Sequence, residues 1–150
     1  MAAGVSCVAK AEDKTEALAL SWDDAKAFAE RFAKCDGFYR AISIYGEYFD
    51  IGPAMREMYN NLANGSQMTA RWFLAHHIRN LDKLNHSTQS MGDRERLRFA
   101  IIFESVIRGE GAEGIMDEIT ATRALCDDLG DVQAYVVNSL RDQMYGVEPQ

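Results

Sequence analysis

The chain is poor in proline and histidine and has no long apolar run. Its 150 residues include 2 prolines, 3 histidines and 3 cysteines. So few prolines, without any low-complexity tract, argue against long disordered segments. Because no run of about 18 apolar residues occurs, we predict no membrane-spanning helix and no membrane partner. The first residues, MAAGVSCVAK, lack the basic and apolar regions of a secretion signal, so we expect a cytoplasmic protein.

The three cysteines, Cys7, Cys35 and Cys126, are odd in number and widely spaced. No CxxC pair is present, which argues against a zinc knuckle or a redox pair. We therefore expect free thiols in a reducing compartment. The chain also lacks HExxH and Glu-x-x-His patterns, so no metal or other cofactor is predicted.

Charge is unevenly distributed along the chain, whose net charge is −7. Residues 1–64 carry 7 basic and 10 acidic side chains, residues 65–100 carry 6 and 3, and residues 101–150 carry 3 and 10. The acidic balance disfavours general nucleic-acid binding, which requires neutralisation of phosphates. The acidic last third suits a partner protein with a basic surface.

Apolar residues recur at helical spacing through most of the chain. Ser21 is placed to cap a helix over 22–35, and Gly37 is expected to end it. Pro53 is suited to the first position of another helix. A helix is expected over 38–49, and the helix that begins at Pro53 is expected to end at a turn at 64–66. Four further helices are expected, over 67–85, 94–109, 112–129 and 131–145, with a loop at 86–92.

These elements predict an all-α protein, a compact bundle of about five to six helices in a single domain. The expected domain covers 16–146, between a flexible N-terminal arm at 1–15 and a tail at 147–150.

The segment RWFLAHHIRNLDKLNH, residues 71–86, holds all three histidines. On a helix over 67–85, His77 lies within an apolar face and is expected to be a hydrogen-bonded core histidine. His76 is expected to be half-exposed. A second face mixes apolar and charged residues, a composition typical of protein interfaces. We predict that this face binds a partner through Met68, Trp72, Arg79, Asp82 and His86.

One alternative hypothesis is a ribonuclease. The stretch RNLDKLNH, from Arg79 to His86, resembles the Arg-x4–6-His motif of HEPN-type helical ribonucleases. That resemblance implies metal-independent cleavage of RNA, in which Arg79 and His86 of two protomers meet at a homodimer interface. Ser87 and Thr88 follow the histidine, where an aromatic residue is frequent in that family.

A second alternative is an accessory protein that binds RNA or DNA through the basic middle of the chain, where Arg94, Arg96 and Arg98 alternate. Alternate residues spread around a helix and do not line one groove. We therefore favour a non-catalytic helical module that binds another protein, such as an adaptor, an inhibitor, an assembly chaperone or a small subunit of a larger complex.

Overall fold

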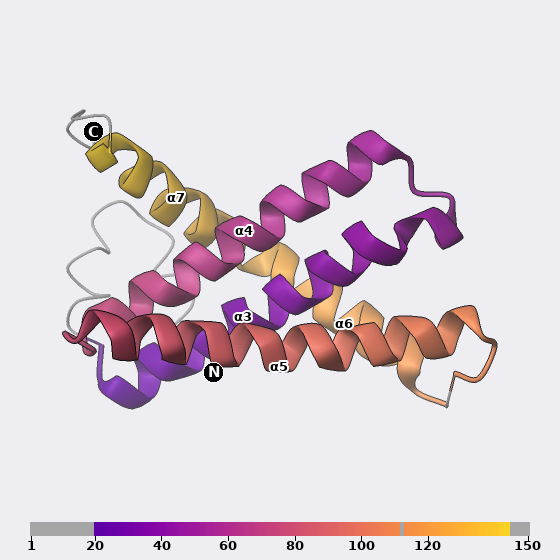
Figure 1. Cartoon of the computed structure of the whole chain (residues 1–150), viewed down its shortest axis with the longest axis horizontal. Coiled ribbons are helices and arrows are strands. Elements are labelled where there is room, and N and C mark those ends of the chain that lie inside the picture. Colours follow the sequence, from indigo (N-terminus) through magenta and orange to yellow (C-terminus); the bar gives the residue numbers. More distant parts are fainter. Residues whose placement is uncertain (1–19, 112, 145–150) are drawn as a thin grey trace.

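The computed structural model describes residues 20–111 and 113–144, which form five α-helices and no strand (Figure 1). The helices are α3 (Trp22–Tyr45), α4 (Pro53–Ala75), α5 (Leu81–Ile107), α6 (Ile115–Asp128) and α7 (Gly130–Met144), with a short 3₁₀ helix η2 (Gly46–Phe49) after α3. The predicted all-α, single-domain bundle is confirmed. The expected arm at 1–15 and tail at 147–150 lie outside the described residues.

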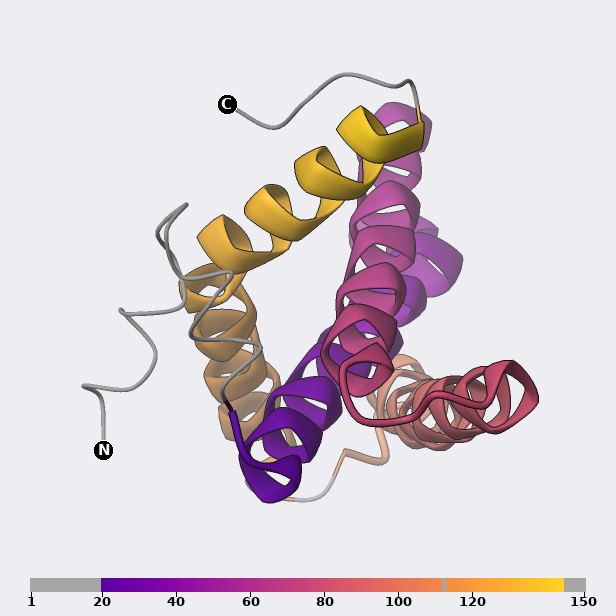
Figure 2. The same ribbon diagram turned by 90° about the vertical axis from the view of Figure 1, so that its left-hand side faces the viewer.

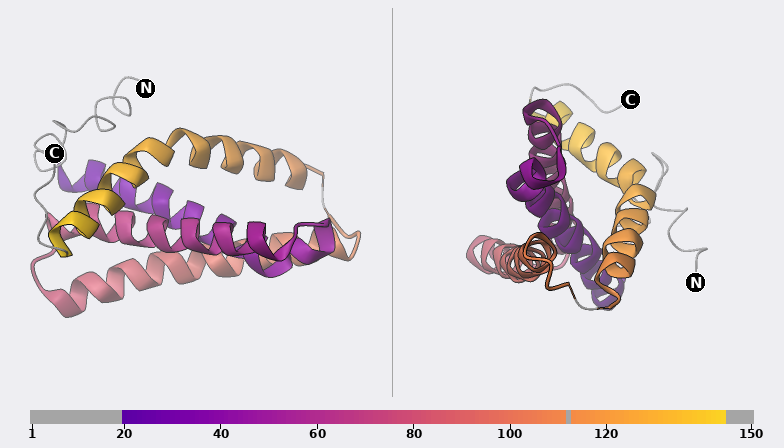
Figure 3. Two further views of the ribbon diagram at one scale, coloured as in Figure 1. Left: turned by 90° about the horizontal axis from the view of Figure 1, so that it is seen from above. Right: turned by 90° about the vertical axis from the view of Figure 1, so that its right-hand side faces the viewer.

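The long helices α3, α4 and α5 build the main body, and α6 and α7 form a bent arm beside it. Figure 2 shows α6 and α7 meeting at an angle, and Figure 3 shows the same arm from two further directions. Helix α6 contacts α3, whereas α7 contacts α4. None of the described helices is long and apolar enough to cross a membrane.

Aromatic side chains dominate the core between α3, α4 and α5. Phe28 stacks on Phe73 with ring centroids 5.0 Å apart, and Phe38 meets Phe99 edge to face at 5.6 Å. These offset and T-shaped arrangements are the ones that aromatic quadrupoles favour. The core therefore joins the middle of α3 to both of the other long helices.

Two local predictions of helix starts are confirmed. The Ser21 hydroxyl accepts a hydrogen bond from the backbone N–H of Asp24 at 3.1 Å and so caps α3. Pro53 occupies the first turn of α4, where its missing N–H has no helical partner to lose.

The predicted stop at Gly37 is wrong, because α3 continues to Tyr45. Gly37 lies where α3 crosses α5. A Cβ on Gly37 would lie 2.6 Å from the carbonyl carbon of Glu95 and 2.7 Å from its oxygen. This glycine therefore permits close helix packing and does not end the helix.

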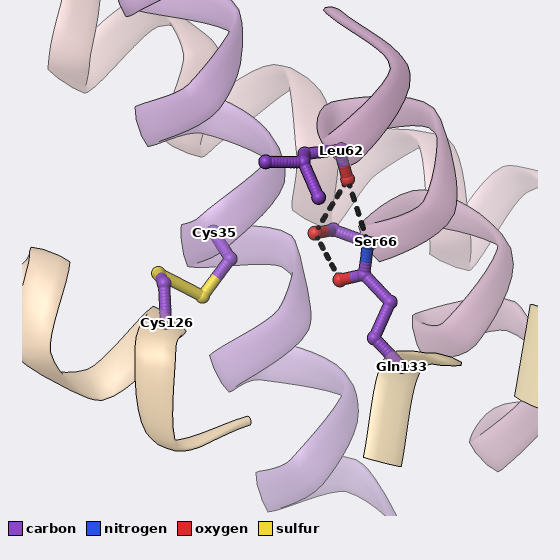
Figure 4. Close-up of a disulfide and its surroundings, with 5 residues drawn as sticks. All are labelled: Cys35, Leu62, Ser66, Cys126 and Gln133. Carbon is purple, nitrogen blue, oxygen red and sulfur yellow. Dashed lines mark hydrogen bonds between the residues drawn. A yellow bond between two sulfur atoms is a disulfide. The ribbon is translucent and has the colours of Figure 1, made fainter. Parts of the chain in front are cut away.

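The predicted turn at 64–66 is also wrong, because these residues lie inside α4. A Cβ on Gly65 would lie 2.5 Å from Nε2 of Gln133 on α7. Ser66 is buried, and its hydroxyl lies 2.7 Å from Oε1 of Gln133 and 2.9 Å from the carbonyl oxygen of Leu62 (Figure 4). Gly65 and Ser66 are thus small enough to leave space for the Gln133 side chain, which joins α7 to α4.

The helix predicted over 67–85 is two helices. Helix α4 ends at Ala75, residues 76–80 form a linker, and the side chain of Asn80 caps α5 by accepting from the N–H of Lys83 at 3.0 Å. The expected loop at 86–92 is helical and belongs to α5. A single helical wheel for 67–85 therefore does not describe these side chains.

A disulfide joins Cys35 in the middle of α3 to Cys126 near the end of α6 (Figure 4). The expectation of free thiols is therefore wrong for both residues, while Cys7 lies outside the described part of the chain. Both cysteines are buried, and their Cα atoms are 5.6 Å apart. The arm is thus attached covalently to the main body.

A buried carboxylate lies at the crossing of α3 and α5. Asp36 is fully buried, and one of its oxygens lies 2.6 Å from a guanidinium nitrogen of Arg96. Arg40 approaches the other oxygen at 3.5 Å and donates to Asn64 at 2.9 Å. Burial raises the pKa of Asp36 above its ordinary value, against the opposing effect of the two arginines.

Candidate partner-binding groove

Two apolar hollows lie between the main body and the arm. The first has a volume of about 360 Å³ and is lined by residues of α3, η2, α4, α5 and α6. The second, of about 490 Å³, lies between α3, α4 and α7. Because Tyr39, Met58 and Leu62 line both hollows, we treat them as one feature and call it the Tyr39 groove.

The wall of the Tyr39 groove is rich in aromatic rings and methionine. Its aromatic lining residues are Phe38, Tyr39, Phe49, Tyr59 and Phe103. Three apolar side chains that line it are also open to solvent, with exposed fractions of 41% for Phe49, 42% for Met58 and 61% for Met116. Such a solvent-open apolar surface is typical of sites that bind a ligand or another protein.

Charged groups lie on the arm side of this groove and on α4. Arg123 and Asp127 of α6 line the first hollow, and Glu57 of α4 lines the second. Burial raises the pKa of the Tyr39 hydroxyl, and the negative charge of Asp127 raises it further. Tyr39 therefore remains a neutral phenol over the physiological pH range.

Local sequence explains how these side chains reach the groove. Tyr39 and Ile42 lie three residues apart on α3, and Met58 and Leu62 lie four apart on α4, so each pair shares one helix face. Sequence reasoning placed these residues on apolar stripes but did not identify a groove. The available signal was the apolar band of α3 around residues 38–45, which is wider than one core face requires.

The five residues of the predicted interface do not form one surface. Met68 lines a shallow hollow with Arg71 and Gln89, whereas Asp82 and His86 line a different one with Trp22. The reason is that α4 ends before the linker at 76–80, so the expected common helix face does not exist.

Trp72 and Arg79 also differ in their surroundings. The Trp72 ring meets the rings of Phe73 and His76 edge to face, at centroid distances of 5.0 and 4.6 Å, and packs against the core. Arg79 is exposed in the linker. Trp72 therefore serves packing at least in part, and Arg79 does not lie on a helix.

Arg79 and His86 do not share the helix face on which the ribonuclease hypothesis depended. Arg79 precedes the cap of α5, whereas His86 is exposed within the helix. The geometric premise of that hypothesis is wrong, and the ribonuclease activity itself stays a prediction.

The other two histidines lie near the start of the linker. His77 is only partly buried, its ring meets Trp22 edge to face at 5.9 Å, and its buried Nε2 has no hydrogen-bond partner among the described residues. The expectation of a hydrogen-bonded core histidine is therefore wrong. His76 is partly exposed, as expected, and its Nδ1 lies 2.7 Å from the carbonyl oxygen of Trp72. Within residues 20–111 and 113–144, no three His, Cys, Asp or Glu side chains gather as a metal site would require.

Comparison of the chain with models of protein families, with curated proteins and with solved structures gave no match.

Proposed function

We propose that this chain is a non-catalytic helical module that binds a segment of a partner protein in the Tyr39 groove. The observation that carries the proposal is the solvent-open rim of Phe49, Met58 and Met116 around an apolar hollow. Methionine side chains are flexible and polarisable, and they are frequent on surfaces that accept apolar helices. This groove replaces the face around Trp72 as the proposed binding surface.

The charge of the arm defines the chemistry of the proposed partner. Residues 113–144 contain seven acidic and two basic side chains, a net charge of −5. Asp127 and Glu57 lie in the groove itself. A helix with an apolar stripe and lysines or arginines beside it would place its apolar residues in the hollow and its charges against the arm.

The disulfide bears on where this binding takes place. Disulfides form and persist in oxidising environments and are rare in the cytosol. Cys35–Cys126 therefore favours folding in an oxidising compartment over the cytoplasmic location expected from the sequence.

The test uses a defined probe, a fluorescein-labelled peptide of about 16 residues with leucines at helical spacing and lysines elsewhere. Its binding to the full chain is measured by fluorescence polarisation for two variants, Met58→Gln and Met68→Gln. Both methionines lie on α4 and are 42% and 41% exposed, but only Met58 lines the groove. Because glutamine adds no charge, the pair separates apolar docking from general attraction to an acidic protein.

We expect Met58→Gln to weaken binding about tenfold and Met68→Gln to leave it within about twofold. Equal weakening by both variants would mean that the peptide does not dock in the groove, and weakening by Met68→Gln alone would place the peptide on the surface around Met68. Sedimentation of the unlabelled protein provides a further check. A dimer that Met58→Gln dissociates would identify a second copy of the chain as the occupant and overturn the proposed partner.

A further inference from the structure

Tyr39 lines both hollows of the groove. Tyr39 is only 8% exposed, and its ring contacts those of Phe38 and Tyr59 at centroid distances of 5.8 and 5.9 Å. Unlike Met58 and Phe49 on the rim, Tyr39 is held in one place by its neighbours. Tyr39 is therefore a fixed part of the wall that both hollows share.

The hydroxyl of Tyr39 makes no hydrogen bond to any residue of the described chain, whereas that of Tyr45 donates to a Glu104 carboxylate oxygen at 2.8 Å. An open groove lets water satisfy the Tyr39 hydroxyl. An occupant that displaces this water without replacing its hydrogen bond loses affinity. The part of the partner that enters the hollow therefore needs a polar atom that forms a hydrogen bond with the Tyr39 hydroxyl.

The remaining lining decides what kind of group carries that atom. Five aromatic rings around about 360 Å³ suit a flat aromatic side chain, which packs against them edge to face or offset. Asp127 and Arg123 line the same hollow as Tyr39, and the carboxylate raises the pKa of the Tyr39 hydroxyl more than the guanidinium lowers it. A hydrogen-bond donor is therefore more favourable beside this hydroxyl than an acceptor. Tryptophan and tyrosine both combine a large aromatic body with a neutral donor. The indole N–H only donates, whereas a tyrosine hydroxyl also presents acceptor lone pairs to the Asp127 carboxylate, so tryptophan fits this hollow better.

We propose that Tyr39 determines the specificity of the groove by accepting a hydrogen bond from the indole N–H of a tryptophan on the partner helix. This inference rests on the proposed function and names the residue type that the partner inserts. The indole ring would lie in the first hollow with its nitrogen toward the Tyr39 oxygen. Phenylalanine in its place would leave that oxygen without a partner.

The test is a double-mutant cycle on the full chain. Two versions of the basic peptide carry either tryptophan or 1-methyltryptophan at the central apolar position, so they differ only by replacement of the N–H. Each is titrated against the wild-type protein and Tyr39→Phe, which keeps the ring and removes the oxygen. We expect the wild type to prefer tryptophan by about fivefold to tenfold and Tyr39→Phe to show a ratio near one.

The bulk of the added methyl group is common to both proteins, so it cancels in the cycle. An unchanged ratio in Tyr39→Phe would overturn the inference, as would equal binding of the two peptides to the wild type. Collapse of the ratio in Asp127→Asn, with no change in Tyr39→Phe, would make the carboxylate the acceptor and also overturn it. These outcomes are independent of the comparison between Met58→Gln and Met68→Gln, which decides whether the groove binds the peptide at all.

Discussion

Breaking the disulfide between Cys35 and Cys126 tests how the arm is attached to the main body. The perturbation is reduction of the wild-type protein, with the double variant Cys35→Ala/Cys126→Ala as a second route to the same state. The two cysteines are 91 residues apart in sequence, so the bond closes a loop that spans most of the described chain. Reduction frees this loop in the unfolded state while the folded contacts remain.

The size of the effect follows from the length of that loop. For a separation of 91 residues, the chain-entropy relation gives a loss of about 4.6 kcal/mol in the free energy of unfolding at 25 °C. Single domains are stable by only about 5–15 kcal/mol, so this is a large share of the total. With an ordinary urea dependence, the midpoint of unfolding should fall by roughly 2 M.

The assay is urea unfolding followed by circular dichroism, for the oxidised protein, the reduced protein and the alanine variant. Hydrogen exchange then locates the change. The arm buries only a few side chains against the main body, among them Leu129, Val132 and Val136. Its backbone amides should therefore lose protection before those of α3 and α4.

Midpoints of the oxidised and reduced proteins within about 0.5 M of each other would refute this reasoning. Such a result would mean that noncovalent contacts alone hold the arm, including the buried hydrogen bond that the Ser66 hydroxyl donates to Oε1 of Gln133. Alkylation of Cys35 and Cys126 in the native protein without reductant would refute the bond itself.

Two further predictions concern the crossing of α3 and α5. Gly37→Ala should lower the free energy of unfolding by about 1–3 kcal/mol, because the new Cβ would meet Glu95 backbone atoms at 2.6–2.7 Å. This loss is expected even though alanine is more favourable than glycine inside a helix by about 1 kcal/mol. The control is Gly130→Ala, where no atom lies within 4 Å of the added Cβ; it should be neutral or slightly stabilising in the same urea experiment. A Gly37→Ala variant more stable than the wild type would contradict the close crossing of α3 and α5. Asp36→Asn tests the buried carboxylate: since burial raises the pKa of Asp36 in the folded protein, its stabilising contribution is present at low pH and is lost as the pH rises through that pKa. The stability deficit of the asparagine variant should therefore be smaller at about pH 7 than at about pH 3, and a larger deficit at pH 7 would show that attraction to Arg96 outweighs the cost of burial.

Helix starts were predictable where a single residue satisfies the backbone locally. Ser21 caps α3 with its own side chain, and Pro53 lacks the N–H that the first turn of a helix leaves unpaired. These are effects of a few neighbouring residues, so they do not depend on the rest of the fold. The apolar spacing that predicted an all-α bundle is local in the same sense.

Helix interiors containing glycine were not predictable in this way. Gly37 and the Gly65-Ser66 pair have the composition of breaks, yet each lies where another helix approaches too closely for a larger side chain. The partner residues, Glu95 and Gln133, are more than fifty positions away in the chain. A local pattern does not distinguish a glycine that ends a helix from one that is required by such a contact.

The location of the candidate site was even less predictable from the sequence than the helix interiors, because it depends on how the helices pack. Placing one helix over 67–85, and extending it to His86, put Trp72, Arg79 and His86 on a common face that does not exist once α4 ends at Ala75. The groove that replaces it joins Tyr39 of α3, Met58 of α4 and Asp127 of α6. No spacing rule relates these three residues, because they meet only where the arm lies beside the main body.

The sequence by itself determined the helical class, the two helix starts and the acidic character of the last third, because helical periodicity, capping and charge are properties of neighbouring residues. The tertiary structure decided the pairing of Cys35 with Cys126, the burial of Asp36 and the position of the groove. Each of these depends on which helix faces cover one another, and that choice is made by packing across the whole domain.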